Sequence, residues 1–345
     1  MELTLDASYG EGGGQILRTA LSLAVLPAVL RRIRARRPKP GLQPQHLTVV
    51  RALAEISEAD VAGDQLDSTE LRFAPRTLRG GAYRLDVGAI RGSAGSVSLL
   101  FQALLLPLAF AAVPSRLTLI GGTHVPWSPP AHYVSDVYLA ALRRVGVQAD
   151  VALRRWGWYP RGGGEIEAVV TPTAGLAGLH WLDRAPPVMI SGVSAVSRLP
   201  RAIAERQSAR AVERLAAAGF AAEVGVVEDR PALGPGTLLL LTATGRTSVA
   251  GASALGRRGL RAEAVADAAA DELLRYLGSG ASVDDHLADQ LVPFLALARE
   301  ESVFTCPSLT NHLQTVAWVV EQLAGARVEL SEGPPARVRV TPGPA

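Results

Sequence analysis

Apolar residues along this chain switch repeatedly between two spacings. Alternate apolar positions are typical of a strand, and apolar positions three or four residues apart are typical of a helix. Residues 1–90 are therefore predicted to form a β-α-β-α-β-β unit, called a module below. Its predicted strands lie at residues 3–6, 30–37, 70–73 and 83–87, and its predicted helices at 16–23 and 43–56.

The same order of elements recurs twice, which indicates weak internal repetition of a module of roughly 80 residues. In the second module, helices are predicted at 95–112 and within 129–145, and strands at 117–120, 147–153 and 164–170; its first strand is weakly marked. In the third, helices are predicted at 264–277, at 286–299 and from His312, and strands at 303–306, 326–330 and 336–340. Small residues at 12–14, 92–96 and 308–311 open one helix in each module.

Residues 182–260 do not fit this period. They contain predicted strands at 187–196, 221–227 and 237–243 and a predicted helix at 200–219. We interpret them as a small α/β domain inserted in an exposed connection. The predicted fold is mixed α/β (α+β), with modules one and two in residues 1–181, the insert in 182–260, and the third module in 261–345, where it completes the large domain.

Composition adds limits to this picture. Hydrophobic residues make up 48% of the 345 residues and aromatic residues only 5%, so Leu, Val and Ala must fill a large core. The formal charge of +3 does not by itself indicate nucleic acid. Six basic residues nevertheless crowd into residues 31–39, either as a solvated loop or as a surface for an anion.

The residues that commonly build metal and nucleophile sites are sparse. Cys306 is the single cysteine, which excludes an intramolecular disulfide and a cysteine-based zinc site. It could be a thiol nucleophile, but a small buried residue at a strand end is the better interpretation. The six histidines form no tight pair with a carboxylate at helical spacing, and no Gly-x-Ser-x-Gly motif occurs.

The start of the chain and its most apolar stretch both favour a protein that acts in the cytoplasm without a membrane anchor. Residues 1–6 contain acidic positions and are predicted as a strand rather than a signal peptide. The longest uncharged stretch, 95–114, contains Gln102 and Pro107, so we expect a buried core helix rather than a membrane span.

His312 lies where a helix is predicted to begin, because small polar residues at 308–311 precede an apolar-periodic run at 316–323. The unpaired N–H groups and positive dipole end of a helix N-terminus suit a phosphate. The dipole should also disfavour the imidazolium, keeping the ring neutral and nucleophilic. The alternative is an ordinary surface histidine near a cap.

A glycine-rich turn at residues 9–15 joins the first predicted strand to the first helix. Such a turn lets backbone N–H groups approach an anion, although its spacing fits neither the Walker motif nor the dinucleotide fingerprint. Glu11 inside it suits a metal ion that accompanies the anion, and Arg18 lies one turn into the helix. The alternative is a turn without a ligand.

Two further stretches allow either a structural or a binding role. At residues 284–290, Asp284, Asp285 and Asp289 suit a helix N-terminus, whereas an Asp289-Gln290 pair could hold ribose hydroxyls beside a stacking His286. A second glycine triplet at 162–164 is either a flexible turn or a point of close backbone approach.

Several of these stretches together resemble the RNA 3′-terminal phosphate cyclases. The opening Gly10-Glu11-Gly12-Gly13-Gly14-Gln15-Ile16-Leu17-Arg18-Thr19 after Asp6 and the segment Leu287-Ala288-Asp289-Gln290-Leu291 are the most specific together. The matching segments follow one another in the family's order over almost the whole chain, and the insert is the one part that they match weakly. Further matching segments lie at 33–37, 40–42, 45–47, 92–96, 121–123, 129–131, 159–164 and 308–312.

The resemblance implies three β-α-β-α-β-β modules plus an insert, the architecture also used by enolpyruvyl transferases. It implies ATP-dependent conversion of an RNA 3′-phosphate to a 2′,3′-cyclic phosphodiester, so the expected partners are ATP and RNA. His312 would form a covalent AMP adduct, AMP would pass to the RNA 3′-phosphate, and the 2′-hydroxyl would displace it. The sequence leaves open whether the protein forms a homodimer.

The resemblance also implies roles for individual residues. Glu11 would bind a divalent metal, Mg²⁺ or Mn²⁺. Arg18, Arg34, Arg37 and Gln45 would bind phosphates or RNA. The nucleoside would be bound by residues from two predicted modules, namely Gln102, Pro129, Tyr133, His286, Leu287, Ala288, Asp289 and Gln290. Many family members have an aromatic residue where His286 stands, and read His-Leu-Leu-Thr-Asn where this chain has His312-Leu313-Gln314-Thr315-Val316.

Two other functions are compatible with this fold. One is a non-catalytic RNA-binding protein of ribosome assembly, a branch that lacks the histidine; His312, Glu11, Arg18 and Asp289 argue against it. The other is an enolpyruvyl-type transferase, which would need no covalent nucleotide. Formation of an AMP adduct distinguishes the cyclase from both.

Overall fold

The computed structural model describes residues 3–23, 27–92, 94–184, 188–228 and 231–343. Its first module contains β1 (Leu3–Asp6), α1 (Gly14–Ser22), β2 (Ala28–Arg31), α2 (Pro44–Ser57), β3 (Asp60–Ala62) and β4 (Leu71–Ala74). The sheet order is β1-β2-β4-β3, with β1 parallel to β2 and the other pairs antiparallel. Because β1 and β2 are parallel, the β1–α1 and β2–α2 turns lie at the same end of the sheet.

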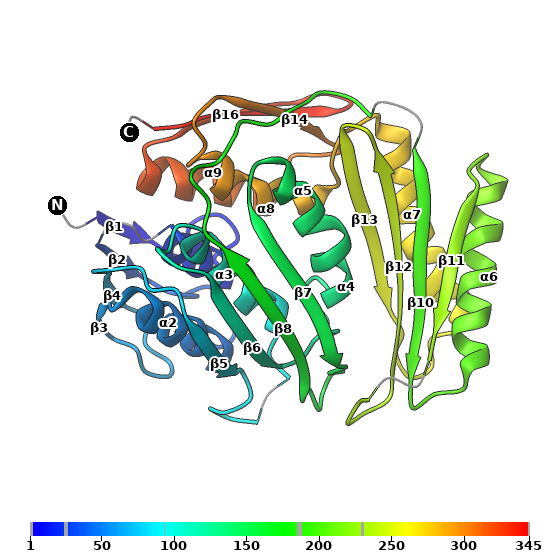
Figure 1. The fold of residues 1–345 in the computed structure, drawn as a ribbon, viewed down its shortest axis with the longest axis horizontal. Helices are drawn as coiled ribbons and strands as arrows, with labels where there is room; N and C mark the ends of the chain where they lie inside the picture. The colour runs from blue at the N-terminus through cyan, green and yellow to red at the C-terminus, as the bar shows by residue number, and fades with distance from the viewer. Residues whose placement is uncertain (1–2, 24–26, 93, 185–187, 229–230, 344–345) are drawn as a thin grey trace.

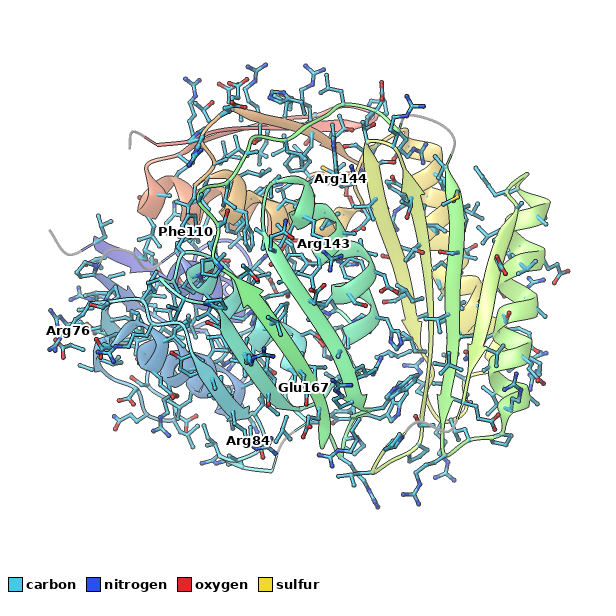
Figure 2. The ribbon with its side chains drawn as sticks, in the orientation of Figure 1. Arg76, Arg84, Phe110, Arg143, Arg144 and Glu167 are labelled. Atoms are coloured by element: carbon cyan, nitrogen blue, oxygen red, sulfur yellow. The ribbon has the colours of Figure 1, made fainter. Side chains whose placement is uncertain are left out.

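The second module repeats that topology. It contains β5 (Ala82–Asp86), α3 (Val97–Ala109), β6 (Ser115–Gly121), α4 (Ala131–Tyr133), the π-helical η1 (Val134–Tyr138), α5 (Leu139–Arg144), β7 (Gln148–Arg155) and β8 (Gly164–Thr171), in the sheet order β5-β6-β8-β7. Again only the first pair, β5 and β6, is parallel. The exposed Arg143 and Arg144 mark the C-terminal end of α5 (Figure 2), where cations complement the helix dipole.

The third module is split by the insert. It consists of β9 (His180–Trp181), α8 (Asp285–Leu295), β14 (Ser302–Cys306), α9 (Asn311–Ala324), β15 (Arg327–Ser331) and β16 (Ala336–Thr341). Its sheet order is β15-β16-β14-β9, and β9 pairs in parallel with β14 across the insert. All three sheets therefore share one pairing pattern, which confirms the predicted threefold repeat.

The insert forms a sheet of its own beside the second module (Figure 1). It contains β10 (Met189–Ser197), α6 (Arg201–Ala217), β11 (Ala222–Val227), β12 (Gly236–Gly245), β13 (Ser248–Leu255) and α7 (Ala262–Ser279), in the sheet order β11-β10-β12-β13. Helix α7 shares a hydrophobic cluster with these strands. We therefore propose that the insert extends through α7, to about residue 279, rather than ending at residue 260.

Two predicted strands differ from the structure. The segment at 83–87 is β5, the first strand of the second module, and the missing strand of the first module is the three-residue β3, too short to leave a periodic signal. The segment predicted as a strand over 30–37 ends at Arg31, because Arg32 and Arg34 have left-handed φ of 57° and 52°. The basic cluster therefore lies on a turn, not on a strand.

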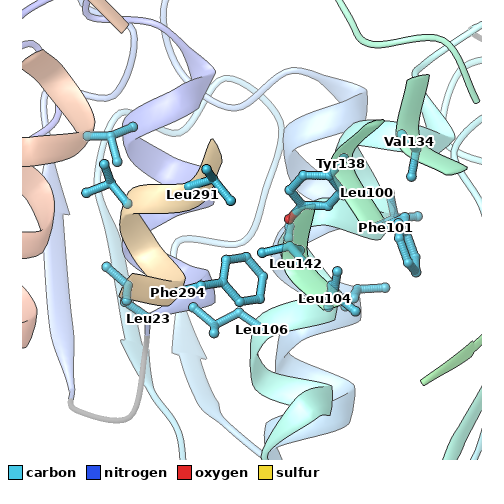
Figure 3. Packing of buried hydrophobic residues seen from close by; sticks show 14 of the residues in the cluster. Leu23, Leu100, Phe101, Leu104, Leu106, Val134, Tyr138, Leu142, Leu291 and Phe294 are labelled. Carbon is cyan, nitrogen blue, oxygen red and sulfur yellow. The ribbon is translucent and has the colours of Figure 1, made fainter. Parts of the chain in front are cut away.

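The central core is shared by all three modules. Tyr138 of η1 meets Phe294 of α8 edge-to-face, with ring centroids 6.3 Å apart, among leucines of α3 (Figure 3). Helix α3 is buried on nearly all sides, which confirms that the uncharged stretch at 95–114 contains a core helix. Among the residues described, no helix combines the length and apolarity that crossing a bilayer requires.

Candidate functional site

His312 lies in the first turn of α9, as the sequence predicted. Thr310 is the N-cap, and its hydroxyl accepts a hydrogen bond from the backbone N–H of Leu313 at 3.1 Å. Asp285, in the first turn of α8, accepts hydrogen bonds from the N–H of Ser308 at 2.9 Å and from its hydroxyl at 3.0 Å. Two helix N-termini are thus tied together at the histidine, whose side chain is 53% exposed.

Glu11 of the glycine-rich turn lies against His312, with its Oε2 3.0 Å from the Nε2 of the histidine. Helix α9 also supports the turn itself. The Glu11 N–H faces the Thr315 hydroxyl at 3.4 Å, and Tyr9 stacks on Trp318 with centroids 4.2 Å apart. Residues about 300 positions apart in sequence therefore form one unit, so α9 carries both the histidine and the surface that holds its carboxylate partner.

The charge state of His312 differs from our expectation. Its hydrogen bond to Glu11 raises the pKa of His312, and the same bond is the main reason that the pKa of Glu11 falls to about 2. The helix dipole was expected to keep the ring neutral, but a carboxylate in direct contact outweighs the partial charge of a helix end. In the ligand-free protein the pair therefore favours the imidazolium.

Arginines surround this pair. Arg37 donates to the Glu11 carboxylate and, at 3.2 Å, to the Glu11 backbone carbonyl. Burial lowers the pKa of Arg18 to about 10, with Asp289 and Glu11 as its acidic neighbours, so this group is still charged at neutral pH. Arg34 instead donates to the carbonyl of Lys39 at 2.6 Å and braces the 39–41 turn. Arg36, which sequence reasoning missed, donates to the Gly10 carbonyl.

Gln45 and His46 begin α2 beside these arginines. The Gln45 amide oxygen accepts a hydrogen bond from the Ser96 N–H at the start of α3, at 3.2 Å. The His46 Nδ1 accepts from the Gln43 N–H at 3.2 Å, and its ring fills the space beside Gly14, which leaves no room for a Cβ there. Burial lowers the pKa of His46 to about 3, so it is a neutral support; the motif at 45–47 was its only signal in the sequence.

The polar residues predicted for the nucleoside meet between α3, α8 and α1. Gln102 donates to Gln290 at 2.8 Å, although 188 residues separate them. Asp289 accepts from the Gln15 amide at 2.5 Å, and burial raises the pKa of Asp289 to about 6. The side chains of Leu287 and Ala288 are fully buried in the core, so these two residues could reach a ligand only through their backbone.

The three residues expected to flank adenine differ from one another in burial and in their contacts. Pro129 is half-buried at the start of the segment that leads to α4. His286 is on the surface, where its Nε2 lies 3.1 Å from Glu272 of α7, and this hydrogen bond raises the pKa of His286 to about 9. Tyr133 is buried, and its hydroxyl donates to Asp284 at 2.9 Å. The free protein therefore holds the His286 and Tyr133 side chains in separate contacts.

Asp284 joins three parts of the molecule. This buried carboxylate accepts from Tyr133 of the second module, from the Gly251 N–H of the insert at 2.9 Å, and from the N–H groups of His286 and Leu287 at 2.9 and 2.8 Å. Burial raises its pKa. The sequence predicted a helix N-terminus here but gave no signal for the bonds to Tyr133 and Gly251.

Glu11 and the side chains around it do not form a metal site by themselves. Both carboxylate oxygens already face cationic groups, Arg37 and His312, and the described residues contain no group of three His, Cys, Asp or Glu side chains that could hold a metal. One carboxylate beside a phosphate site does fit a cation that arrives with a triphosphate. Cys306 is buried and burial raises its pKa to about 12, which disfavours the thiol as nucleophile.

Comparison with known proteins gives one consistent family. Residues 9–330 match the model of the family described as RNA 3′-terminal phosphate cyclase. A protein of that name from Methylococcus capsulatus is 48% identical over 99% of this chain and 97% of its own length. Namesakes from Nostoc punctiforme and Pyrobaculum neutrophilum are 43% and 42% identical, each over at least 96% of both chains.

Solved structures give weak similarities. The enolpyruvyl transferase NikO from Streptomyces tendae has a TM-score of 0.29 at 15% identity, covering 49% of this chain and 33% of that one. An EPSP synthase from Acinetobacter baumannii has a TM-score of 0.28 at 12% identity, covering 99% of this chain and 64% of that one. The sequence relatives are matched over nearly their full length. The chain therefore belongs to the RNA 3′-terminal phosphate cyclase family.

Proposed function

We propose that this protein converts an RNA 3′-phosphate end into a 2′,3′-cyclic phosphodiester at the expense of ATP, through an AMP adduct on His312. One observation carries the proposal: a half-exposed histidine at a helix N-terminus lies 3.0 Å from Glu11, which is paired with Arg37 and has Arg18 close by. A nucleophile, unpaired backbone N–H groups and fixed cations then converge where a phosphate would be attacked.

The chemistry proceeds in three displacements at phosphorus. An imidazole nitrogen of His312 forms a bond to the α-phosphorus of ATP, and the bond to the pyrophosphate oxygen breaks. An oxygen of the RNA 3′-phosphate then takes the AMP, and the P–N bond breaks. The 2′-hydroxyl attacks the activated 3′-phosphorus, loses its proton to a base, and AMP leaves. The last step is intramolecular, so its nucleophile is already in place.

His312 has to change partner before the first step. In the free protein its Nε2 is held by Glu11 and the ring tends to be protonated. Attack requires the neutral imidazole with a free lone pair, so the extra proton must first pass to solvent. Binding of a triphosphate supplies negative charge that competes with Glu11 for Arg37, which gives Glu11 and His312 the freedom to rearrange.

The other site residues divide between phosphate and nucleoside. Arg18 and Arg37 adjoin Glu11 and would hold phosphates, with Arg34 and Gln45 at the flank of the same turn. Gln102, Asp289 and Gln290 present amide and carboxylate groups for ribose or base. Pro129, Tyr133 and His286 would flank adenine after His286 exchanges its contact with Glu272.

A divalent cation, Mg²⁺ or Mn²⁺, is part of the proposal as a companion of the triphosphate. When bound, it would neutralise phosphate charge beside Glu11. Glu11 would then be its single carboxylate ligand from this chain, an arrangement in keeping with the preference of Mg²⁺ for substrate phosphates and water.

The test is adduct formation with α-labelled ATP and a divalent metal, followed by denaturing electrophoresis. Wild type should acquire an acid-labile, alkali-stable label. His312→Ala should acquire none, whereas His180→Ala, which removes an exposed histidine from β9, should be labelled like wild type. Absence of label from wild type, with ATP binding intact, would contradict the proposal and favour a non-catalytic RNA-binding protein.

A further inference from the structure

Two large aromatic side chains are exposed outside the site described above. Trp127 is 98% exposed, in the connection between β6 and α4, and Tyr159 is 67% exposed, in the β7–β8 turn. Single exposed apolar residues are common on proteins. These two differ because their loops are hydrogen-bonded to one another.

Backbone hydrogen bonds join the two loops. The N–H groups of Thr123 and His124 both donate to the Gly157 carbonyl, at 2.9 and 3.0 Å, and the Gly157 N–H donates to the Thr123 hydroxyl at 2.8 Å. The topology agrees, because Gly121 pairs with Gly164 where β6 ends and β8 begins. Trp127 and Tyr159 therefore project from neighbouring loops at one end of the sheet.

The base beneath these loops is a buried aromatic cluster. The His124 ring stacks on Trp156 at 4.9 Å and lies 4.8 Å from Trp158, and its Nε2 is 2.8 Å from the Nδ1 of His132. Trp127 itself has a left-handed φ of 66°, which is uncommon for a bulky residue. The hydrogen bonds and ring contacts at the base of the loops reduce the amount of chain that a ligand would have to order on binding the indole.

Small residues connect this end of the sheet to the histidine site. A Cβ on Gly162 would meet Ala94 at 3.0 Å, and Ser96 forms a bridge with Gly122. The Ser96 N–H in turn donates to Gln45 at the start of α2. Close backbone contacts between small, mostly buried residues therefore link the aromatic loops to the start of α2.

Positive charge accompanies the aromatic residues. Arg161 is exposed in the Tyr159 loop, and one of its nitrogens donates to the Leu233 carbonyl at 3.2 Å. Arg84 is largely exposed at the lower edge of the same sheet (Figure 2), and its nearest carboxylate, Glu165, is 3.7 Å away. Stacking faces interleaved with arginines are the usual composition of surfaces that bind single-stranded nucleic acid.

We propose that Trp127, Tyr159 and Arg161 form a platform for unpaired RNA, on which nucleotides upstream of the 3′-phosphate stack while that phosphate occupies the arginines beside His312. The platform rests on the proposed function for its substrate. It requires single-stranded RNA, because the bases of a duplex already stack on each other and hide their faces. Selection would be for an unpaired 3′ tail, not for a base sequence.

The test compares variants in binding a 5′-fluorescein RNA of about ten nucleotides with a 3′-phosphate, measured by fluorescence anisotropy at fixed salt. Trp127→Ala and Tyr159→Ala should each weaken binding about tenfold, and Trp127→Phe should retain most of the affinity. Met189→Ala, which removes another exposed large side chain but in the insert, should bind like wild type. Because the Trp127 side chain is almost wholly in solvent, its removal creates no cavity.

Ligands of different length distinguish binding at the platform from binding at the phosphate site. The loss in Trp127→Ala should appear with the oligonucleotide and disappear with a nucleoside 3′,5′-bisphosphate, which is too short to reach both. Equal affinity of Trp127→Ala and wild type for the oligonucleotide would overturn the platform. So would an equal loss of affinity for ATP, which would assign the indole to the nucleotide. If wild type forms no AMP adduct but Trp127→Ala still loses RNA affinity, the proposed catalysis fails and the platform stands.

Discussion

At the scale of single residues, the contact between Glu11 and His312 sets the charge of the proposed nucleophile. Attack needs the neutral ring, and Glu11 raises the pKa of His312, so adduct formation in the free protein should increase with pH through a value above 6.5. Glu11→Gln removes the carboxylate. The acid limb of the profile of kcat/KM for ATP should then move to lower pH, whatever happens to the maximum rate.

This expectation has a linked consequence for stability. Folding raises the pKa of His312, so the protonated ring stabilises the folded state. This stabilisation is complete below the pKa of the unfolded chain and is lost as the pH rises through the pKa of the folded state. Folding lowers the pKa of Glu11 from 4.5 to about 2, so the ionised carboxylate stabilises the folded state. This stabilisation is present above pH 4.5 and is lost as the pH falls towards 2. The pair therefore stabilises the folded protein most between about pH 4.5 and 6.5.

An unshifted acid limb in the kcat/KM profile of Glu11→Gln would show that another group controls the protonation of His312.

The sequence predicted which residues gather at the site better than it predicted what they contact. His312 at a helix start follows from local capping signals. The partners of His286 and Asp284 could not be foreseen, because Glu272 and Gly251 belong to the insert and approach only in the folded chain. Likewise, Leu287 and Ala288 match the family motif, but their side chains fill the core.

At the scale of elements, the glycine-rich turn is fixed by its contact with α9. Gly10 has a left-handed φ of 53°, and a Cβ there would overlap the Thr315 side chain. Gly10→Ala should cost about 1–3 kcal/mol through the strained backbone alone. Because Glu11 follows directly, the variant should also form the AMP adduct much more slowly than wild type.

Gly278 provides the matched control for that substitution. It lies in α7 with open space around it, so Gly278→Ala should stabilise the protein by about 0.5–1 kcal/mol and leave adduct formation unchanged. Denaturant unfolding measures the first quantity and labelling with ATP the second. Normal labelling of Gly10→Ala would mean that the turn adjusts without displacing Glu11, and that its position is not set by α9.

Element identity was predictable where periodicity is strong, and less so where elements are short. The helices α1, α2, α3, α8 and α9 fall where apolar spacing indicates them. The strands β3 and β9 have three and two residues, so they gave no pattern, and the strand at 83–87 was consequently placed in the wrong module. Recognition of one pairing order in all three sheets needed the structure.

At the scale of the whole molecule, the site is an interface of three modules. Glu11 and Arg37 come from the first, Gln102 from the second, and Asp289 and His312 from the third. The insert contacts the start of α8 through Gly251, Glu272 and Arg275, which bond to Asp284, His286 and Asp285. We therefore expect the insert to act on the site by holding α8 rather than by supplying chemistry.

The insert sheet also joins two cores, because β12 is apolar on both faces. Leu238 and Leu240 pack into the central core, whereas Leu239 and Leu241 pack against α6 and α7. Such a sheet cannot lose one face without disturbing the other, so we expect the insert and the modules to unfold together. Leu241→Ala should destabilise the protein by about 2–5 kcal/mol.

Two spectroscopic signals test that coupling. The five tryptophans all lie outside residues 189–279, and two of them, Trp156 and Trp158, touch the insert at Ala232 and Gly236. Their fluorescence therefore reports on the modules and on this contact, whereas circular dichroism also reports on α6 and α7. In denaturant, Leu241→Ala should shift both transitions equally, and the exposed-site control Met189→Ala should shift neither by more than about 0.5 kcal/mol. A dichroism transition that precedes the fluorescence transition would mean that the insert unfolds alone. The site could then persist without it, and the bond of Asp284 to Gly251 would not be needed to hold α8 in place.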